Sequence, residues 1–229
     1  MPGVTVLELA NAYPRLYHMA GAGSWPSIQT HGLLSTTSLL DLFGVIGERR
    51  ISLEERHRPT SVVIRHKNHG SAVVRDQKPM SDEGLVRALG GKLTPRDWYV
   101  LLNRRVFFWV TPARLRTLMD ARAYKDLRKT ILVLDTRLVL LAHAPAVLLC
   151  PMNSGATKPM PHPRGSSTFL PLSSYPFEDR RSAGKEAVVE LTVEGGVQNV
   201  SRLALRVEEV GGGSPPRVLV GSGPSEFGG

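Results

Sequence analysis

The chain has almost no cysteine and none of the common nucleotide-binding or hydrolase signatures. Cys150 is the single cysteine among 229 residues, which excludes an internal disulfide and a cysteine-rich zinc site. It follows an apolar run and is predicted to be a small buried side chain. GxGxxG, GxxxxGKS/T, HExxH and GxSxG are all missing, so dehydrogenase, P-loop kinase, zinc protease and serine hydrolase functions have no support.

Long hydrophobic runs are missing as well. No stretch approaches 18 uninterrupted apolar residues, so no transmembrane helix and no membrane partner are predicted. Met1 to Ala10 lacks the basic start of a signal peptide and carries Glu8 within its apolar run. These features predict a cytoplasmic protein.

Positive charge is in excess. Lysine and arginine total 29 against 20 acidic residues, a net charge of +9, which favours polyanionic partners such as nucleic acids. A basic sector between Gly47 and Lys78 holds Arg49, Arg50, Arg56, Arg58, Arg65, Lys67 and Arg75. Most of these side chains are predicted to be solvated, although any arginine among them could bind a pyrophosphate through two parallel hydrogen bonds.

The hydrophobic pattern alternates between helix and strand signals and predicts an α+β fold. Strands are predicted over residues 14–19, 61–64, 106–110, 130–134, 188–193 and 200–210. Helices are predicted over residues 24–31 and 35–43, and from Thr94-Pro95 and Thr111-Pro112 onward, where an N-cap residue precedes a proline. Ser52–Glu55 has capping-box spacing before a short basic helix, and residues 137–142 fit either a helix or a strand.

Two segments are predicted to lack regular secondary structure. Residues 152–177 are rich in proline, serine and glycine, and a loop of this length in a compact domain is more often a functional lid than an accident. Within it, residues 153–157 and 164–167 could bind phosphate, but turns are the preferred interpretation. The chain is therefore divided into one domain over residues 1–210 and a linker-like tail over residues 211–229, with its last nine residues mobile.

Glu190 is the first candidate functional residue. It follows Val188-Val189 and precedes Leu191 and Val193, so both faces of its strand are apolar. A solvated glutamate is the ordinary interpretation for a strand, but a carboxylate in this setting must be paired or functional.

His18 is the second polar side chain in an apolar strand, between Tyr17 and Met19. It could be a core histidine bonded to a backbone carbonyl, or it could bind a ribose hydroxyl. His57, His66 and His69 lie in a polar, basic stretch without a recognised metal spacing, and we interpret them as surface residues; no metal site is predicted.

Three segments carry a resemblance to a known family. Residues 16–19 and 25–35 resemble the opening of ADP-ribosyltransferase-fold proteins, in which a strand with a histidine precedes a helix and the phrase I-x-x-x-G-L. Similar openings occur in DarT-type DNA ADP-ribosyltransferases, rifampin ADP-ribosyltransferases and RNA 2′-phosphotransferases. Residues 106–109 are similar to the DarT strand that leads into a helix, and residues 189–193 resemble the DarT segment with the catalytic glutamate.

The resemblance implies an ADP-ribosyltransferase-like fold, in which two packed, mostly antiparallel sheets flanked by helices form a cleft for NAD. NAD would be the co-substrate, without a metal. His18, with Tyr17 beside it, would contact the ribose on the nicotinamide side. Phe108 or Trp109 would flank the nicotinamide in place of the family's usual tyrosine, and Glu190 would be the catalytic carboxylate.

The resemblance also implies an arginine on the NAD phosphates, for which Arg49, Arg58 and Arg105 are candidates, and a substrate-recognising loop in residues 152–177. With the net charge, it favours a nucleic-acid base as the acceptor, single-stranded DNA before RNA, and a toxin with an antitoxin or ADP-ribose hydrolase as partner. Two alternatives stay open: a nucleic-acid-binding module of the same fold without catalysis, and a transferase acting on a protein or small molecule.

Overall fold

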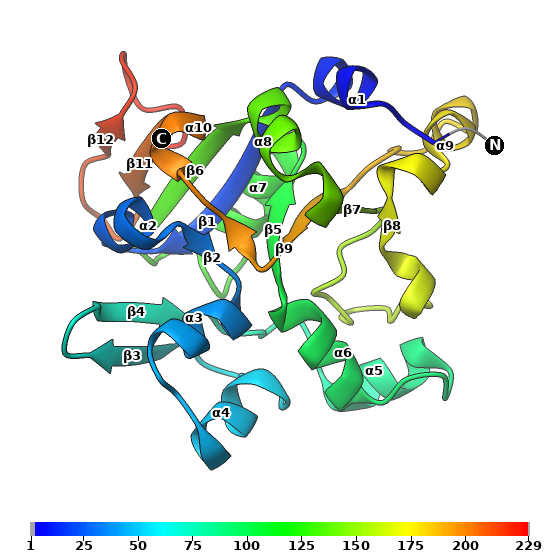
Figure 1. The fold of residues 1–229 in the computed structure, drawn as a ribbon, viewed down its shortest axis with the longest axis horizontal. Coiled ribbons are helices and arrows are strands. Elements are labelled where there is room, and N and C mark those ends of the chain that lie inside the picture. Colours follow the sequence, from blue (N-terminus) through cyan, green and yellow to red (C-terminus); the bar gives the residue numbers. More distant parts are fainter. Residues whose placement is uncertain (1–2, 229) are drawn as a thin grey trace.

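The computed structural model describes residues 3–228 as an α+β fold around one large antiparallel sheet (Figure 1). The sheet has eight strands, in the spatial order β12 (Arg217–Val220), β11 (Ala204–Val210), β6 (Lys129–Asp135), β1 (Arg15–Gly21), β5 (Arg105–Trp109), β9 (Glu190–Glu194), β7 (Val147–Cys150) and β8 (Leu170–Pro171). Two small sheets pair β2 (Leu33–Leu34) with β10 (Gly196–Val197) and β3 (Val62–His66) with β4 (Gly70–Val74).

Helices cover both faces of the large sheet. The first face packs against α1 (Val6–Ala12), α2 (Trp25–His31), α8 (Thr136–His143) and α10 (Val200–Leu203). On the second face, α7 (Pro112–Asp120) covers β1 and β6, whereas α5 (Asp82–Leu89) and α6 (Pro95–Asn103) cover the other half of the sheet. Short 3-10 turns occupy Ala144–Ala146, Ser166–Thr168 and Leu172–Ser174, and α9 (Phe177–Ser182) lies close to α1 (Figure 1).

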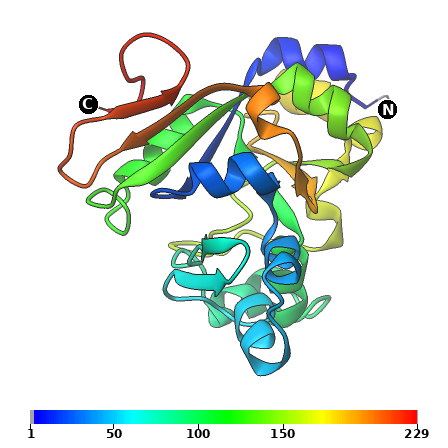
Figure 2. The same cartoon turned by 60° about the vertical axis from the view of Figure 1, so that its left-hand side comes forward.

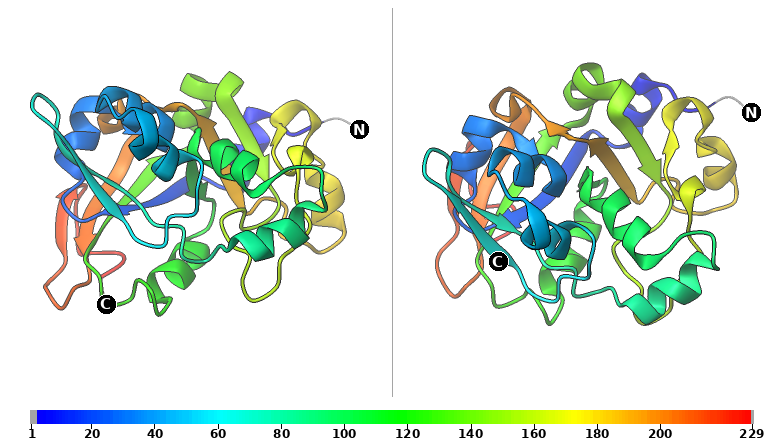
Figure 3. Two further views of the ribbon diagram at one scale, coloured as in Figure 1. Left: turned by 90° about the horizontal axis from the view of Figure 1, so that it is seen from below. Right: turned by 60° about the horizontal axis from the view of Figure 1, so that its bottom comes forward.

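The hairpin of β3 and β4 packs against α3 (Thr36–Leu42) and α4 (Gly47–Glu54) through a separate small apolar cluster around Leu40, Phe43 and Ile64. Figure 2 and Figure 3 show this group together on the side of the molecule away from α1 and α8. The hairpin is a separate two-stranded sheet, and its strand β4 contacts α2.

The central strands are buried because their side chains are apolar on both faces. In β1, Leu16 and Ala20 enter the core of the first face, whereas Tyr17 and Met19 enter the cluster under α7. This alternation follows from the two-residue period of a strand, and it decides toward which face each polar residue of the sheet projects.

Most of the predicted elements are confirmed. Thr94 and Asp97 form a reciprocal capping box at the start of α6, and the Thr111 hydroxyl accepts a hydrogen bond from the Arg114 amide at the start of α7. Residues 137–142, for which the sequence left both states open, lie in α8. The starts of α6 and α7 are set by side chains next to them in the chain, which is why local sequence could locate them.

Two predictions about elements are wrong. Ser52 is not an N-cap: α4 has already begun at Gly47, after Ile46 in an extended conformation, and the Ser52 hydroxyl donates back to the Arg49 carbonyl. The predicted strand over residues 200–210 begins only at Ala204, because Asn199 adopts a positive φ of 53° and starts the short helix α10.

The tail is ordered where the sequence predicted a linker. β12 pairs with β11 at the edge of the sheet. Beyond it, a buried ion pair of Arg206 and Glu208 holds the chain: the Arg206 guanidinium donates to the Ser222 carbonyl at 2.8 Å, and the Glu208 carboxylate accepts from the Ser225 hydroxyl. Both charged residues belong to β11 and lie outside the tail itself, so the glycine and proline content of the tail alone could not reveal the order.

Among residues 3–228, no helix is long and apolar enough to cross a bilayer.

The large sheet divides at its centre. β1 and β5 share a single residue pair, Tyr17 opposite Trp109. Beyond this pair, β1 continues to Gly21 and is paired only with β6. Strand β5 is paired with β9 along its whole length, from Trp109 back to Arg105. The two halves of the sheet therefore separate on one side of this pair.

Candidate functional site

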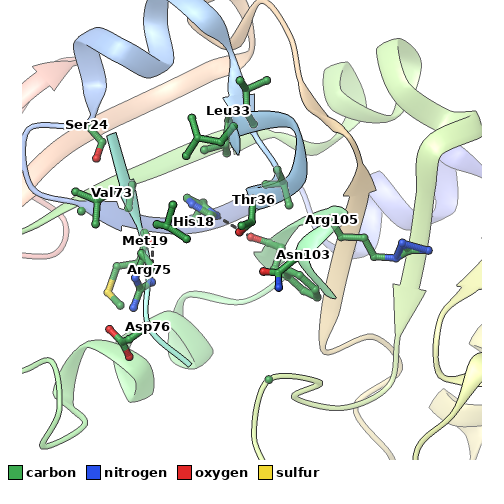
Figure 4. Close-up of a pocket in the computed structure, with 18 of the residues that line it drawn as sticks. His18, Met19, Ser24, Leu33, Thr36, Val73, Arg75, Asp76, Asn103 and Arg105 are labelled. Atoms are coloured by element: carbon green, nitrogen blue, oxygen red, sulfur yellow. Dashed lines mark hydrogen bonds between the residues drawn. The ribbon is translucent and has the colours of Figure 1, made fainter. Parts of the chain in front are cut away.

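A cavity of about 370 Å³ lies where β1 and β5 separate. Its walls come from β1 and the loop after it, from α2, β2 and α3, and from β4 and the residues that follow it (Figure 4). The end of α6, strand β5 and the first residues of the 152–177 loop complete the lining. Sites for small molecules typically measure 300–1,000 Å³, so this cavity is of the right size for a ligand.

The cavity brings His18 and Glu190 together. By strand alternation His18 projects with Leu16 and Ala20 toward the first face, whereas Glu190 projects toward the second, beside its ladder partner Trp109. Both side chains nevertheless line the same cavity, because the strands between them have separated. Two groups that a continuous sheet would keep apart therefore share one space.

His18 is held as a neutral ring. Its Nδ1 lies 2.8 Å from the Phe107 carbonyl oxygen (Figure 4), and because a carbonyl only accepts, Nδ1 carries the proton. Burial lowers the pKa of His18 to about 4, and the positive charge of Arg75 acts in the same direction. The bond to a backbone carbonyl, one of the two alternatives that the sequence left open, is present, and it leaves Nε2 as a hydrogen-bond acceptor.

Glu190 is buried, with 4% of its surface exposed, and it is paired, as the apolar strand predicted. Its carboxylate accepts hydrogen bonds from the Ser154 hydroxyl at 2.6 Å and from the Ser154 backbone amide at 3.2 Å. Burial raises the pKa of Glu190 to about 7, although the bonds from Ser154 oppose this rise. A carboxyl that titrates near neutral pH is suited to proton transfer.

Ser154 is a cavity residue that the sequence analysis named only as part of the segment 153–157. It belongs to the 152–177 loop, whose first part is fixed by Arg164: this buried guanidinium donates to the Ser154 carbonyl and to the Ala156 carbonyl, both at 2.7 Å. Residues 153–157 form a turn, which was the preferred interpretation of this segment, and the Asn153 side chain accepts a hydrogen bond from the Gly155 amide. The segment thus positions a donor on Glu190.

Arg75 is the second residue that the sequence did not single out. It lies at the end of β4 and lines the cavity, where its Nη1 donates to the Met19 carbonyl at 2.8 Å and its guanidinium stands 5.1 Å from the centre of the Tyr124 ring (Figure 4). The Tyr124 hydroxyl donates to the neighbouring Asp76. Burial raises the pKa of Asp76, but hydrogen bonds from Tyr124 and Ser61 outweigh it and the pKa is lowered. Arg75 is thus a positioned cation on the cavity wall.

The structure does not bring all three predicted arginines to the cavity. Arg49 is exposed on α4 and is not part of the lining. Arg58 lines the cavity, but its guanidinium donates to the Leu53 carbonyl, to the Arg75 carbonyl at 3.0 Å and to the Asn103 side chain at 3.0 Å. Arg58 therefore joins α4, β4 and α6 and has few donors left for a ligand.

Arg105 lies at the edge of the cavity, and in Figure 4 its side chain points away from His18. It stacks on Phe169 with its guanidinium 5.4 Å from the ring centre, and it forms an ion pair of 3.8 Å with Glu194. Burial lowers the pKa of Arg105. Of the arginines on the lining, Arg75 is therefore the one best placed to meet an anion.

The predicted aromatic residues differ in what they offer. Phe108 is completely buried in the first-face core and packs against the His18 ring, with 5.7 Å between ring centres. Trp109 is partly exposed on the second face, where it pairs with Tyr17 on one side and Glu190 on the other. Tyr17 is buried and packs edge-on against Phe227. Trp109 is therefore the aromatic side chain available to a ligand.

Cys150 is fully buried beside Glu190, as predicted for a small core residue. Burial raises the pKa of its thiol, which donates to the Met152 carbonyl at 3.2 Å. Within the described part of the chain, no group of three or more histidine, cysteine, aspartate or glutamate side chains is arranged to hold a metal ion.

Comparisons with known proteins place the chain in a family without assigning an activity. No curated protein matches it. The model of a family of unknown function, DUF7002, matches residues 14–204, a span that includes every cavity residue discussed above. Because the match covers most of the chain, the protein belongs to the DUF7002 family.

Proposed function

We propose that this protein is an NAD-dependent ADP-ribosyltransferase that modifies a nucleic-acid base, DNA before RNA. One observation carries the proposal: a neutral imidazole and a carboxyl that titrates near neutrality line one cavity, at the point where a sheet divides. The resemblance of the segments around His18, β5 and Glu190 to ADP-ribosyltransferases supplies the chemistry that such a cavity would perform.

The divided sheet supports an ADP-ribosyltransferase-like fold. That fold is expected to have two antiparallel sheets with an NAD cleft between them, and here a single residue pair joins two antiparallel halves. In this proposal the halves correspond to the two sheets. The cavity between them corresponds to the nicotinamide end of the cleft.

Three cavity residues, Glu190, His18 and Trp109, have roles in the proposed reaction. The bond between nicotinamide and C1′ of the ribose breaks, nicotinamide leaves neutral, and positive charge develops at C1′; a carboxylate at Glu190 stabilises this charge. An acceptor nitrogen or oxygen then bonds to C1′, and its proton passes to Glu190, whose raised pKa suits a general base. His18 Nε2 accepts from a ribose hydroxyl, and Trp109 covers the nicotinamide ring.

Arg75 is proposed to bind the pyrophosphate. A hydrogen bond that involves a charged group contributes about 1.5–3 kcal/mol, so Arg75→Ala is expected to raise the KM for NAD about 10- to 100-fold and to change kcat only a few-fold. Arg75→Lys should recover part of the loss, since it restores the charge without the bidentate geometry. Steady-state nicotinamide release with water as the only acceptor, which bonds to C1′ and yields ADP-ribose, measures both constants.

Arg49→Ala is the matched control for Arg75. It removes an exposed arginine of the same basic sector that lies outside the cavity, so its KM should equal that of the wild type. A rise in KM with Arg49→Ala and none with Arg75→Ala would reverse the assignment.

The proposed function is tested by incubating the protein with NAD labelled in its adenylate phosphate, in the presence of single-stranded DNA, RNA or a protein mixture in separate reactions. We expect release of nicotinamide and label on single-stranded DNA. NAD should also raise the melting temperature, because a ligand that binds only the folded state stabilises it.

The outcomes of this experiment separate the alternatives. Tight binding of DNA without label or nicotinamide release would support a non-catalytic nucleic-acid-binding module. Label on protein alone would show that the acceptor is a protein and not a nucleic acid. No nicotinamide release with any acceptor, together with no thermal shift by NAD, would refute NAD-dependent transfer.

A further inference from the structure

We propose that a histidine cluster beside the cavity is the surface on which an unpaired base of the acceptor nucleic acid stacks. The cluster consists of His31, His66 and His69 with Phe43 beneath them. This inference rests on the proposed function, and it names the surface that would recognise the acceptor.

The cluster is assembled from three parts of the chain. His66 ends β3 and His69 lies in the hairpin turn; their rings are stacked, with centres 4.6 Å apart and planes 21° apart. His31, at the end of α2, meets His69 edge-on at 5.0 Å. Phe43, just after α3, lies 6.0 Å from His69 and 6.3 Å from His66. All three histidines are partly exposed.

The cluster adjoins the cavity directly. His31 belongs both to the cluster and to the cavity lining, and Ser71 and Val73 of β4 carry the lining along the same hairpin. A base held on the imidazoles would thus lie next to the cavity. The nucleic-acid strand that carries this base could then place a neighbouring nucleotide in the cavity. The surface is outside the part of the cavity formed by His18, Glu190 and Arg75.

The charge around the cluster suits a nucleic-acid backbone. Arg65 and Lys67, on either side of His66, are exposed, and within residues 3–228 neither forms an ion pair with a carboxylate. By contrast, Arg50 of α4 is paired with Asp41 and Glu54. Unpaired cations next to a partly exposed stack of rings are typical of single-strand binding, in which bases stack on rings and phosphates meet lysine and arginine.

A double variant, His66→Ala/His69→Ala, tests the proposal by equilibrium binding of a fluorescent 12-nucleotide single strand, measured by anisotropy in the absence of NAD. Base stacking on a side chain contributes about 1–3 kcal/mol by alanine substitution, so the variant should bind at least about fivefold more weakly. His143→Ala, which removes an imidazole at the end of α8, is the matched control and should bind like the wild type.

An abasic strand of the same length separates stacking from charge. The wild type should bind it at least about fivefold more weakly than the normal strand, and the double variant should show little further loss. His66→Phe/His69→Phe, which keeps two rings, should restore binding of the normal strand and guards against loss of fold in the alanine variant.

Each result supports or overturns the proposal that the histidine cluster stacks a base. The proposal is overturned if the double alanine variant binds the normal strand within twofold of the wild type. It is also overturned if this variant loses as much affinity for the abasic strand as for the normal strand, or if the phenylalanine variant does not restore binding. Nicotinamide release without an acceptor should be unchanged by all these variants. If the wild type releases no nicotinamide but the binding differences remain, the transferase proposal fails and the base-stacking surface stands.

Discussion

Glu190→Gln is expected to lower NAD turnover about 10²- to 10⁴-fold, the usual contribution of a general base. Glutamine has nearly the same shape and can still accept a hydrogen bond from Ser154, which in the wild type donates to the carboxylate from its amide and its hydroxyl. What the variant lacks is negative charge toward C1′ and a site for the acceptor proton. Single-turnover release of nicotinamide from NAD, with and without single-stranded DNA, measures the loss.

Glu83→Gln is the control for this substitution. Glu83 is exposed on α5, so the variant changes the same chemical group without entering the cavity and should retain wild-type turnover. A loss below about tenfold with Glu190→Gln would make Glu190 a structural residue that holds the 152–177 loop, and the carboxylate mechanism would then have to be abandoned.

The same substitution is expected to stabilise the protein by about 3 kcal/mol at pH 8, because a shift of one pKa unit corresponds to about 1.4 kcal/mol. The pKa of Glu190 rises from an ordinary value of 4.5 to about 7 in the folded state. Above pH 7 the unfolded chain carries a hydrated carboxylate that folding must bury, so ionisation destabilises the fold. Below pH 4.5 the carboxyl is protonated in both states and this cost is absent.

Thermal melting from pH 4.5 to pH 8.5 measures the effect. The Glu190→Gln variant should melt about 6–12 °C above the wild type at pH 8, and the difference should shrink as the pH falls and vanish near pH 4.5. A variant that melts below the wild type at pH 8 would show that the bonds from Ser154 outweigh the cost of burying the charge. A stabilised but inactive variant would indicate that this carboxyl is kept for chemistry at the expense of stability.

Sequence could predict those elements whose limits are set locally. Thr94 and Thr111 cap the helices that follow them, so their positions were readable from a few residues. Ser52 had the same kind of spacing but stood within a helix that had already begun, and nothing local distinguishes the two situations. The tail required Arg206 and Glu208, whose contribution depends on sheet pairing rather than on neighbouring residues.

The same distinction applies to the site. Glu190 and His18 could be predicted because a polar side chain inside an apolar strand is conspicuous, and the structure places both in one cavity. Arg75 was one cation among seven in a basic sector. Its position is decided by the Met19 carbonyl, 56 residues earlier, and by the Tyr124 ring. Ser154 lay in a turn-forming segment, and only the fold brings its amide to Glu190.

The pairing of β1 with β5 and β6 also constrains when the site can exist during synthesis. β1 is made early, but its ladder partners are encoded roughly a hundred residues later, and Glu190 later still. At about 5–20 residues per second, a ribosome reaches Glu190 on the order of 10–30 s after it has made His18. A nascent chain therefore spends that interval without a complete cavity, and a product terminated before β9 has no carboxyl to place in it.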